Sequence, residues 1–163
     1  DKAYSFNKEY SKMIVDKGLF VDSTISKHLL EYESKLMGEK QRASNPNVKS
    51  EPTLESIINI FRYLDSEGVK IIGALDMGMS RADFNKAAAS AWVHVEWLGF
   101  DHWKAIRSIT ITNAEALRIE KSKGLISEGF DADVVFYNND PSANIRNLVF
   151  NPAHVIKNGE IVF

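Results

Sequence analysis

The sequence predicts an α/β fold in which strands and helices alternate, followed by a purely β C-terminal segment. Three observations carry this prediction. Before residue 120, apolar stripes with helical spacing alternate with short β-branched runs. A nearly continuous apolar run, Val69 to Leu75, is typical of a strand buried on both faces of a parallel sheet. After residue 120, the apolar runs are short and separated by Gly, Asn and Pro.

The alternating elements occupy the first hundred residues, and strands that alternate with helices predict parallel βα units. The expected elements are a helix on which Phe6, Tyr10, Met13 and Ile14 share one face and which Gly18 ends, a strand from Leu19 to Ile25, a helix from His28 to Met37, a loop from Gln41 to Ser50, a helix with an apolar stripe from Leu54 to Leu64 that Gly68 ends, the strand from Val69 to Leu75, and a helix from Arg81 to Leu98.

The rest of the chain predicts two short helices and then strands. One helix follows Asp101, and Thr112 with Glu115 suggests a capping box for the next. Residues 133–137 read as a strand. His154 to Lys157 and Glu160 to Phe163 flank Asn158-Gly159, a strong signal for a two-residue hairpin turn of type I′.

The composition is that of an ordinary globular protein of 163 residues, with 44% hydrophobic and 26% charged residues. A net charge of −2 gives no electrostatic case for binding nucleic acid or an anionic membrane. The chain has no cysteine, which excludes disulfides and thiolate metal sites, and no apolar run approaches the roughly 20 residues that cross a bilayer. We therefore expect a cytoplasmic protein, although a chain that begins with Asp1 rather than Met leaves its targeting open.

The C-terminal segment carries a family resemblance. The stretch "KGLISEGFDADVVFYNNDP" and the ending "HVIKNGEIVF" resemble the closing segment of the metal-dependent amidohydrolase superfamily, and "SITITNAEAL", Ser108 to Leu117, is similar to a helix start of that family. The branch that looks nearest is the imidazolonepropionase and Xaa-Pro dipeptidase-like group. The resemblance implies the C-terminal part of a TIM-like (β/α)8 barrel, its last two strands with their helices, over residues 1–120, and part of a small β-sandwich over residues 121–163.

The same resemblance makes Val69 to Asp76 the eighth barrel strand. The family usually ends this strand with Gly-Thr-Asp, and here the residues are Ala74-Leu75-Asp76, so the aspartate matches and the threonine does not. The resemblance implies that Asp76 contacts the metal and moves protons of the attacking water, since barrel strands place catalytic groups at their carboxyl ends. The alternative is a strand-end carboxylate that caps a turn or the next helix. His28, which follows the expected seventh strand, is a candidate substrate-binding residue.

Most of the family's metal ligands have no counterpart here. No His-x-His motif occurs, and one carboxylate cannot hold a catalytic zinc, which generally needs three protein ligands. We therefore expect a divalent metal, zinc, only in the complete enzyme and no tightly bound metal in this chain alone. The complete enzyme would hydrolyse a C–N bond in an amide, cyclic amide or dipeptide. The alternative is a truncated, non-catalytic structural or interaction module.

Half a barrel leaves strand faces and edges uncovered. We therefore expect the missing N-terminal half, or a second copy of the chain, to cover residues such as Val69, Ile71 and those from Leu19 to Val21. His94 reads as a packing residue within a helix. Asp131 and Asp133 look like a carboxylate pair, but turn and strand-start hydrogen bonds explain them better than catalysis does. Lys123 reads as part of a solvated loop.

Overall fold

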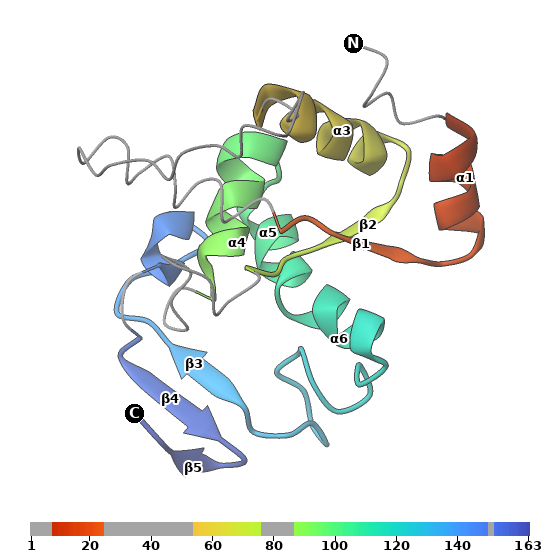
Figure 1. Ribbon diagram of the computed structural model, residues 1–163. Coiled ribbons are helices and arrows are strands. Elements are labelled where there is room, and N and C mark those ends of the chain that lie inside the picture. The colour runs from red at the N-terminus through yellow and green to blue at the C-terminus, as the bar shows by residue number, and fades with distance from the viewer. Residues whose placement is uncertain (1–7, 25–53, 76–86, 150–151) are drawn as a thin grey trace, which may run out of the picture.

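The structure is a computed structural model that describes residues 8–24, 54–75, 87–149 and 152–163 (Figure 1). Its helical segments are α1 (Lys8–Asp16), α3 (Leu54–Ser66), α4 (Ala89–Val93), the π-helical turn η3 (His94–Leu98), α5 (His102–Ser108), α6 (Ile111–Leu117) and the 3₁₀ turn η4 (Ile145–Leu148). Its strands are β1 (Phe20–Asp22), β2 (Lys70–Ile72), β3 (Val134–Phe136), β4 (His154–Lys157) and β5 (Glu160–Ile161). The predicted α/β class is confirmed.

The first two strands, β1 and β2, form a parallel pair in which Val21 lies opposite Ile71. Each strand follows a helix that ends in a left-handed glycine, Gly18 after α1 with φ +60° and Gly68 after α3 with φ +85°. Only glycine adopts this conformation without steric cost, so the two glycines end the helices and turn the chain into the strands. The predicted parallel βα arrangement is therefore confirmed for these two units.

The second strand, β2, differs from the prediction in how it is buried. Val69 and Ile71 are 3% and 4% exposed, whereas Lys70 is exposed and Ile72 is half-buried. Successive side chains of a strand point to opposite faces. One face therefore packs on the helices of this chain and the other is only partly covered, so the prediction of burial on both faces is wrong. The expectation that a partner covers Val69 and Ile71 is wrong for the same reason.

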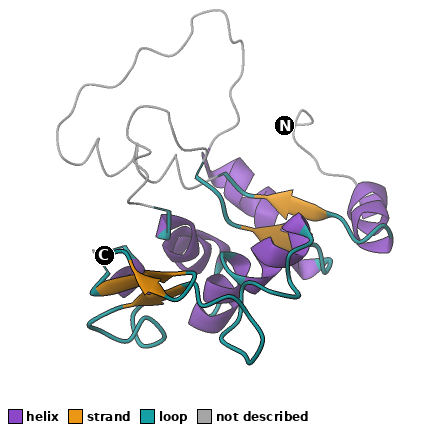
Figure 2. Cartoon of the chain, turned by 90° about the horizontal axis from the view of Figure 1, so that it is seen from below, coloured by secondary structure: helices purple, strands orange, loops and turns teal. Residues whose placement is uncertain are grey.

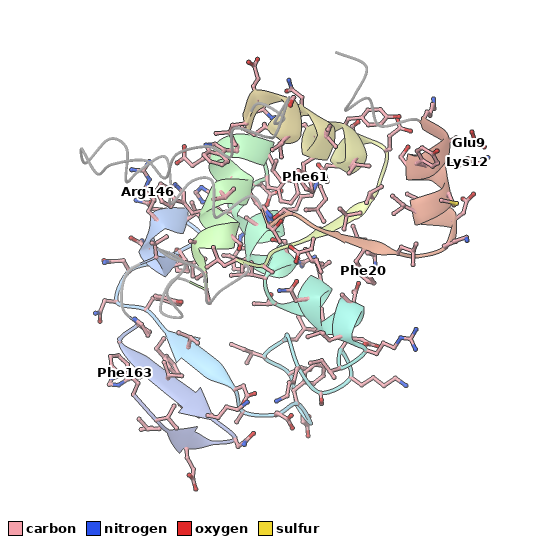
Figure 3. All side chains as sticks on the ribbon, viewed as in Figure 1. Glu9, Lys12, Phe20, Phe61, Arg146 and Phe163 are labelled. Carbon is pink, nitrogen blue, oxygen red and sulfur yellow. The ribbon has the colours of Figure 1, made fainter. Side chains whose placement is uncertain are left out.

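The core lies between the parallel pair and α3, α4, η3 and α5. The helical stripe predicted from Leu54 to Leu64 contributes to this core or packs against it. The buried members of the core are all apolar: Leu64, Val69, Ile71, Ala91, Trp92, Val93, Leu98, Phe100, Ala105, Ile145 and Leu148. Figure 3 shows Phe61 of α3 among the side chains of this helical part. Phe163 lies instead at the sheet of β3, β4 and β5, which is called the outer sheet. Burial of apolar area, worth roughly 25 cal/mol per Å², therefore stabilises the helical part most.

The helices that follow the parallel pair depart from the prediction in two places. The helix expected from Arg81 to Leu98 is described only from residue 87, where it divides into α4 and the π-helical turn η3, and Gly99 ends it with φ +77°. The helix expected after Asp101 is confirmed as α5, and the structure adds that Asp101 caps it, since its carboxylate accepts from the backbone N–H of Lys104 at 2.8 Å. The capping box at Thr112 is wrong, because α6 already begins at Ile111.

The last three strands form an antiparallel sheet in the order β3–β4–β5, separate from the parallel pair (Figure 2). The predicted hairpin is confirmed, because Asn158 and Gly159 both have positive φ, 51° and 83°, between the paired residues Lys157 and Glu160. Several apolar side chains of this sheet are open to solvent: Val135, Phe136, Ile161, Val162 and Phe163. In the described ranges, no helix is long and apolar enough to cross a membrane.

Candidate active-site edge

Asp76, the candidate catalytic and metal-binding residue, and His28, the candidate substrate-binding residue, both lie outside the described residues. The structure does describe the chain up to Leu75, directly before Asp76, and up to Thr24 after β1. Parallel strands bring their carboxyl ends to one edge of a sheet, and in α/β barrels that edge carries the active site. The residues just beyond β1 and β2, namely Ser23 and Gly73 to Leu75, are called the carboxyl edge below.

Backbone hydrogen bonds fix the carboxyl edge in place. The N–H of Ser23 donates to the carbonyl of Ile72 at 3.2 Å, and the N–H of Gly73 donates to the carbonyl of Ser108, at the end of α5, at 3.1 Å. Gly73 is required by packing: a Cβ there would lie 2.7 Å from Cγ2 of Ile109 and 2.8 Å from Cβ of Ser90. The edge is thus packed closely against helices α4 and α5.

A buried histidine connects this edge to the helices. His94, on η3, is fully buried; its Nε2 lies 2.8 Å from Oγ of Ser23 and its Nδ1 lies 2.8 Å from Oγ of Ser108. Burial, and then the nearby positive charge of Lys104, lower the pKa of His94 from 6.5 to about 4. The ring is therefore neutral near pH 7, as expected for a buried imidazole whose partners in the described part of the chain are two serine hydroxyls.

Asn113 of α6 also reaches the edge. Its side-chain amide N–H donates to the carbonyl of Gly73 at 3.0 Å, while its Oδ1 is buried and has no hydrogen-bond partner among the described residues. Asn113 lies in the "SITITNAEAL" stretch that carries part of the family resemblance. This residue of the family-like stretch therefore has a structural role, because its side chain connects the first turn of α6 to the end of β2.

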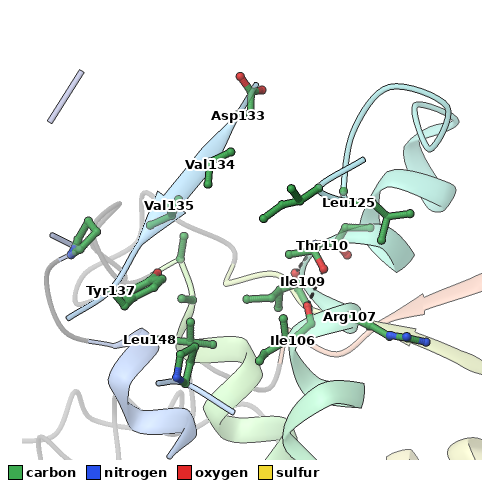
Figure 4. A pocket seen from close by; sticks show the side chains of 18 of the residues that line it. Ile106, Arg107, Ile109, Thr110, Leu125, Asp133, Val134, Val135, Tyr137 and Leu148 are labelled. Carbon is green, nitrogen blue, oxygen red and sulfur yellow. Dashed lines mark hydrogen bonds between the residues drawn. The ribbon is translucent and has the colours of Figure 1, made fainter. Parts of the chain in front are cut away.

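A cavity of about 1510 Å³ opens between the carboxyl edge, the α5–α6 layer and the antiparallel sheet (Figure 4). Its lining is largely apolar. Ile106, Ile109 and Leu125 line one side, and Val135 and Tyr137 line the other. Burial raises the pKa of Tyr137. Polar residues, among them Arg107, Thr110 and Asp133, also line the cavity, so the arrangement suits a largely apolar occupant with a few polar groups.

Asp133, at one end of the cavity, belongs to an ionic group that joins the loop before β3 to the β4–β5 hairpin. Its carboxylate accepts from Nζ of Lys123 at 2.6 Å, from Nζ of Lys157 at 2.6 Å and from the backbone N–H of Asn158 at 2.9 Å. These contacts, that of Lys123 first, hold the pKa of Asp133 well below its usual range. The hydrogen-bonding role expected for Asp133 agrees with this geometry, but the reading of Lys123 as merely solvated is wrong, since it also pairs with Asp131.

Within the described ranges, no group of three or more His, Cys, Asp or Glu side chains is arranged to hold a metal ion. These residues therefore do not fit a catalytic metal by themselves, and the expected absence of tight metal binding stays a prediction. Sequence reasoning placed His94 in the packing, which its burial agrees with, but missed its bonds to Ser23 and Ser108. The sequence features that could have indicated these hydrogen bonds are a histidine within an apolar helix and two serines, Ser23 directly after a strand and Ser108 at the end of another helix.

Comparisons with known structures reveal the same architecture in larger enzymes. The chain is similar to a Xaa-Pro dipeptidase solved with methionine in its active site, at 27% identity and a TM-score of 0.77, over 96% of this chain and 37% of that one. It is similar to an A. niger ochratoxinase at 20% identity and a TM-score of 0.73, over 98% and 35%. It is also similar to a prolidase in complex with N-methylphosphonate-L-proline, at 18% identity and a TM-score of 0.74, over 98% and 38%.

The chain thus spans little more than a third of the length of these structures. Among curated proteins, none matches the sequence significantly. The family model described as the amidohydrolase family matches residues 4–162, nearly the whole chain. The predicted resemblance is therefore confirmed, and the chain belongs to the amidohydrolase family, with prolidase-like structures among its neighbours.

Proposed function

We propose that this chain is the C-terminal part of a metal-dependent hydrolase that cleaves C–N bonds in amides, cyclic amides or dipeptides. The observation that carries the proposal is the parallel β1–β2 pair, whose carboxyl ends meet at one packed edge directly before Asp76. Family membership and the likeness to a Xaa-Pro dipeptidase support it. In this proposal, residues 1–120 belong to a (β/α)8 barrel and residues 121–163 to a β-sandwich.

Asp76 is the proposed general base, and His28 is a proposed substrate contact. A carboxylate at this strand end would accept a proton from the attacking water and return it to the leaving nitrogen. A divalent metal, which we propose to be zinc, would activate that water in the complete enzyme. Asp76 is the single ligand that we assign in this chain, and the others would come from polypeptide outside residues 1–163.

The partner in this proposal is the remaining part of the enzyme or, failing that, a second copy of the chain. The open face of β2, with Lys70 exposed and Ile72 half-buried, supports it, as do the cavity and the exposed apolar residues of the antiparallel sheet. Light scattering with intact-mass measurement checks this. A stable monomer of 18.4 kDa with no second polypeptide would count against the barrel proposal.

The catalytic test is the Asp76→Asn substitution in the longer enzyme. That enzyme is identified by searching the upstream coding sequence for a first His-x-His motif. Asparagine keeps the size but removes the proton acceptor, and general base catalysis is worth roughly two to four orders of magnitude. We expect turnover to fall at least about a hundredfold with the fold intact. The matched control is Asp133→Asn, which should leave turnover within a few-fold. An active Asp76→Asn and a dead Asp133→Asn would move the site away from β2.

The second candidate is a non-catalytic structural or interaction module. The observation that favours it is the missing His-x-His, together with the lack of a metal-binding group among the described residues. Both candidates predict no tightly bound metal in this chain, and elemental analysis after dialysis tests this shared ligand assignment. We expect no stoichiometric transition metal, and one tightly bound ion per chain would contradict this ligand assignment. A cytoplasmic location stays a prediction in both cases.

A further inference from the structure

The hydrogen bonds around His94 define which ring nitrogen carries the proton. Oγ of Ser108 donates its single proton to the carbonyl of Ala105 at 2.7 Å, so it can only accept from the ring. Nδ1 of His94 must therefore carry a hydrogen. In the neutral ring Nε2 then has a free lone pair, and it accepts the hydroxyl proton of Ser23. All three side chains are buried.

This Ser23–His94–Ser108 bridge joins the carboxyl edge to the helices at two points. Ser23 follows β1, and its N–H is bonded to the carbonyl of Ile72 in β2. Ser108 ends α5, and its carbonyl accepts from the N–H of Gly73, which follows β2. The ring itself lies against Gly73, since a Cβ on that glycine would be 3.4 Å from Cε1 of His94. The bridge thus connects both strand ends to one helix.

We propose that the Ser23–His94–Ser108 bridge is a proton-sensitive device that holds the carboxyl edge against α5 while His94 is neutral and releases the edge when Nε2 is protonated. A proton on Nε2 removes the acceptor for the hydroxyl of Ser23. It also places a positive charge in a fully buried site, which costs free energy unless a carboxylate compensates it.

Among the described residues, the charged groups around the ring supply no such compensation. Lys104 of α5 lies near the ring and also pairs with Asp65 of α3, whose Oδ1 is 2.6 Å from its Nζ. The Nζ of Lys104 lies 4.2 Å from the centroid of the Phe100 ring, and the ring centroids of Phe100 and His94 are 5.2 Å apart. The acidic and basic groups on the other elements that pack around the bridge are engaged elsewhere: Asp22 of β1 accepts from the N–H of Thr24, Lys70 of β2 pairs with Glu115, Glu96 of η3 pairs with Arg146, Asp101 caps α5, and Arg107 of α5 is exposed.

The pH range of the release follows from the two pKa values of His94. In the closed edge the pKa is about 4, lowered first by burial and then by Lys104, and in an open, solvated edge it returns to about 6.5. The open state therefore binds more protons between these values, so the closed state loses stability as pH falls. The closed state therefore keeps its full stability above about pH 6.5, and its equilibrium constant against the open state falls on the order of a hundredfold by pH 4.

The device itself does not depend on the proposed function; only its bearing on catalysis does. Asp76 lies three residues after Gly73 in the sequence. If Asp76 is the general base, the bridge therefore positions the end of the strand from which Asp76 follows. His94 would then be a positioning residue for that base. The experiment below reads the bridge directly on residues 1–163, so its failure and the failure of the hydrolase proposal are distinguishable.

The experiment is NMR on the chain of residues 1–163. At pH 7.5 the ring nitrogens of His94 should show hydrogen on Nδ1, and the ring should titrate near pH 4. Amide-exchange protection at Ser23 and Gly73 should fall about a hundredfold from pH 7 to pH 4, whereas Val155 in the antiparallel sheet should change little. Hydrogen on Nε2, a ring pKa near 6.5, or equal protection at both pH values would overturn the proposal.

Two variants test the cause. His94→Gln cannot titrate in this range, so the pH dependence of protection at Ser23 and Gly73 should disappear. Should that variant not fold, Lys104→Gln decides: removing the cation should raise the ring pKa and reduce the fall in protection. Lys70→Gln is the matched control, since it removes an equal charge that pairs with Glu115. Equal ring pKa values in Lys104→Gln and the unaltered chain would contradict the assigned electrostatics.

Discussion

The parallel pair with its helices and the C-terminal antiparallel sheet are stabilised in opposite ways. Around β2, Val69, Ile71 and Leu64 are buried almost completely and one bridge of buried polar groups closes the strand ends. In the outer sheet, Phe136 and Ile161 are 47% and 73% exposed, and ion pairs around Asp133 join loop to hairpin. The first region thus has a core of its own, whereas the second leaves apolar side chains exposed to solvent.

The largest effect should come from the core of the first region. Leu64→Ala removes a side chain that is 1% exposed and packs in the central cluster, so it should cost about 2–5 kcal/mol in the free energy of unfolding. Ile161→Ala, at an exposed position of the outer sheet, should stay within about 0.5 kcal/mol. Urea denaturation of both variants measures this. Equal losses would erase the contrast between the two regions.

A smaller effect is expected from Gly73→Ala at the carboxyl edge. The added methyl group would overlap Cγ2 of Ile109 and Cβ of Ser90, and overpacking costs typically about 1–3 kcal/mol. In an Ile109→Ala background, the same substitution should cost less because one of the two clashes is gone. A double-mutant cycle by chemical denaturation checks the coupling. Strict additivity would mean that the edge is less tightly packed than the structure indicates.

The smallest effect should come from the ionic group of the outer sheet. Lys123, then Lys157 and the N–H of Asn158, lower the pKa of Asp133, so this carboxylate stabilises the fold above its unfolded pKa of about 3.9 and loses that contribution as pH falls below it. Asp133→Asn should lower the melting temperature slightly at pH 7.

That difference should shrink at high salt, because exposed ion pairs are screened, and at low pH, because the contribution of the carboxylate is lost below its unfolded pKa. The control is Glu128→Gln, the same change of charge on an exposed loop residue. Melting curves at two salt concentrations and across pH 2–7 measure both variants. A loss for Asp133→Asn that is independent of salt and pH would point to packing instead of charge.

Local chemistry made several elements predictable. Gly18 and Gly68 end helices because they adopt positive φ, Asp101 caps α5 because its carboxylate accepts an N–H of the first turn, and Asn158-Gly159 makes the hairpin turn. The capping box predicted at Thr112 was wrong because a threonine followed three residues later by a glutamate is also compatible with the interior of a helix, and Thr112 lies inside α6. Each correct case depends on contacts between residues close in sequence.

Long-range contacts decided the rest. The parallel units, the hairpin and the family resemblance could be predicted from the amino-acid sequence, because they depend on local patterns and motifs. Only the tertiary structure revealed that β2 is buried on one face, and that His94 joins Ser23, 71 residues before it, to Ser108. Burial on a given face and the hydrogen-bond partners of a buried histidine depend on which distant elements pack together, and periodicity along the chain does not encode that choice.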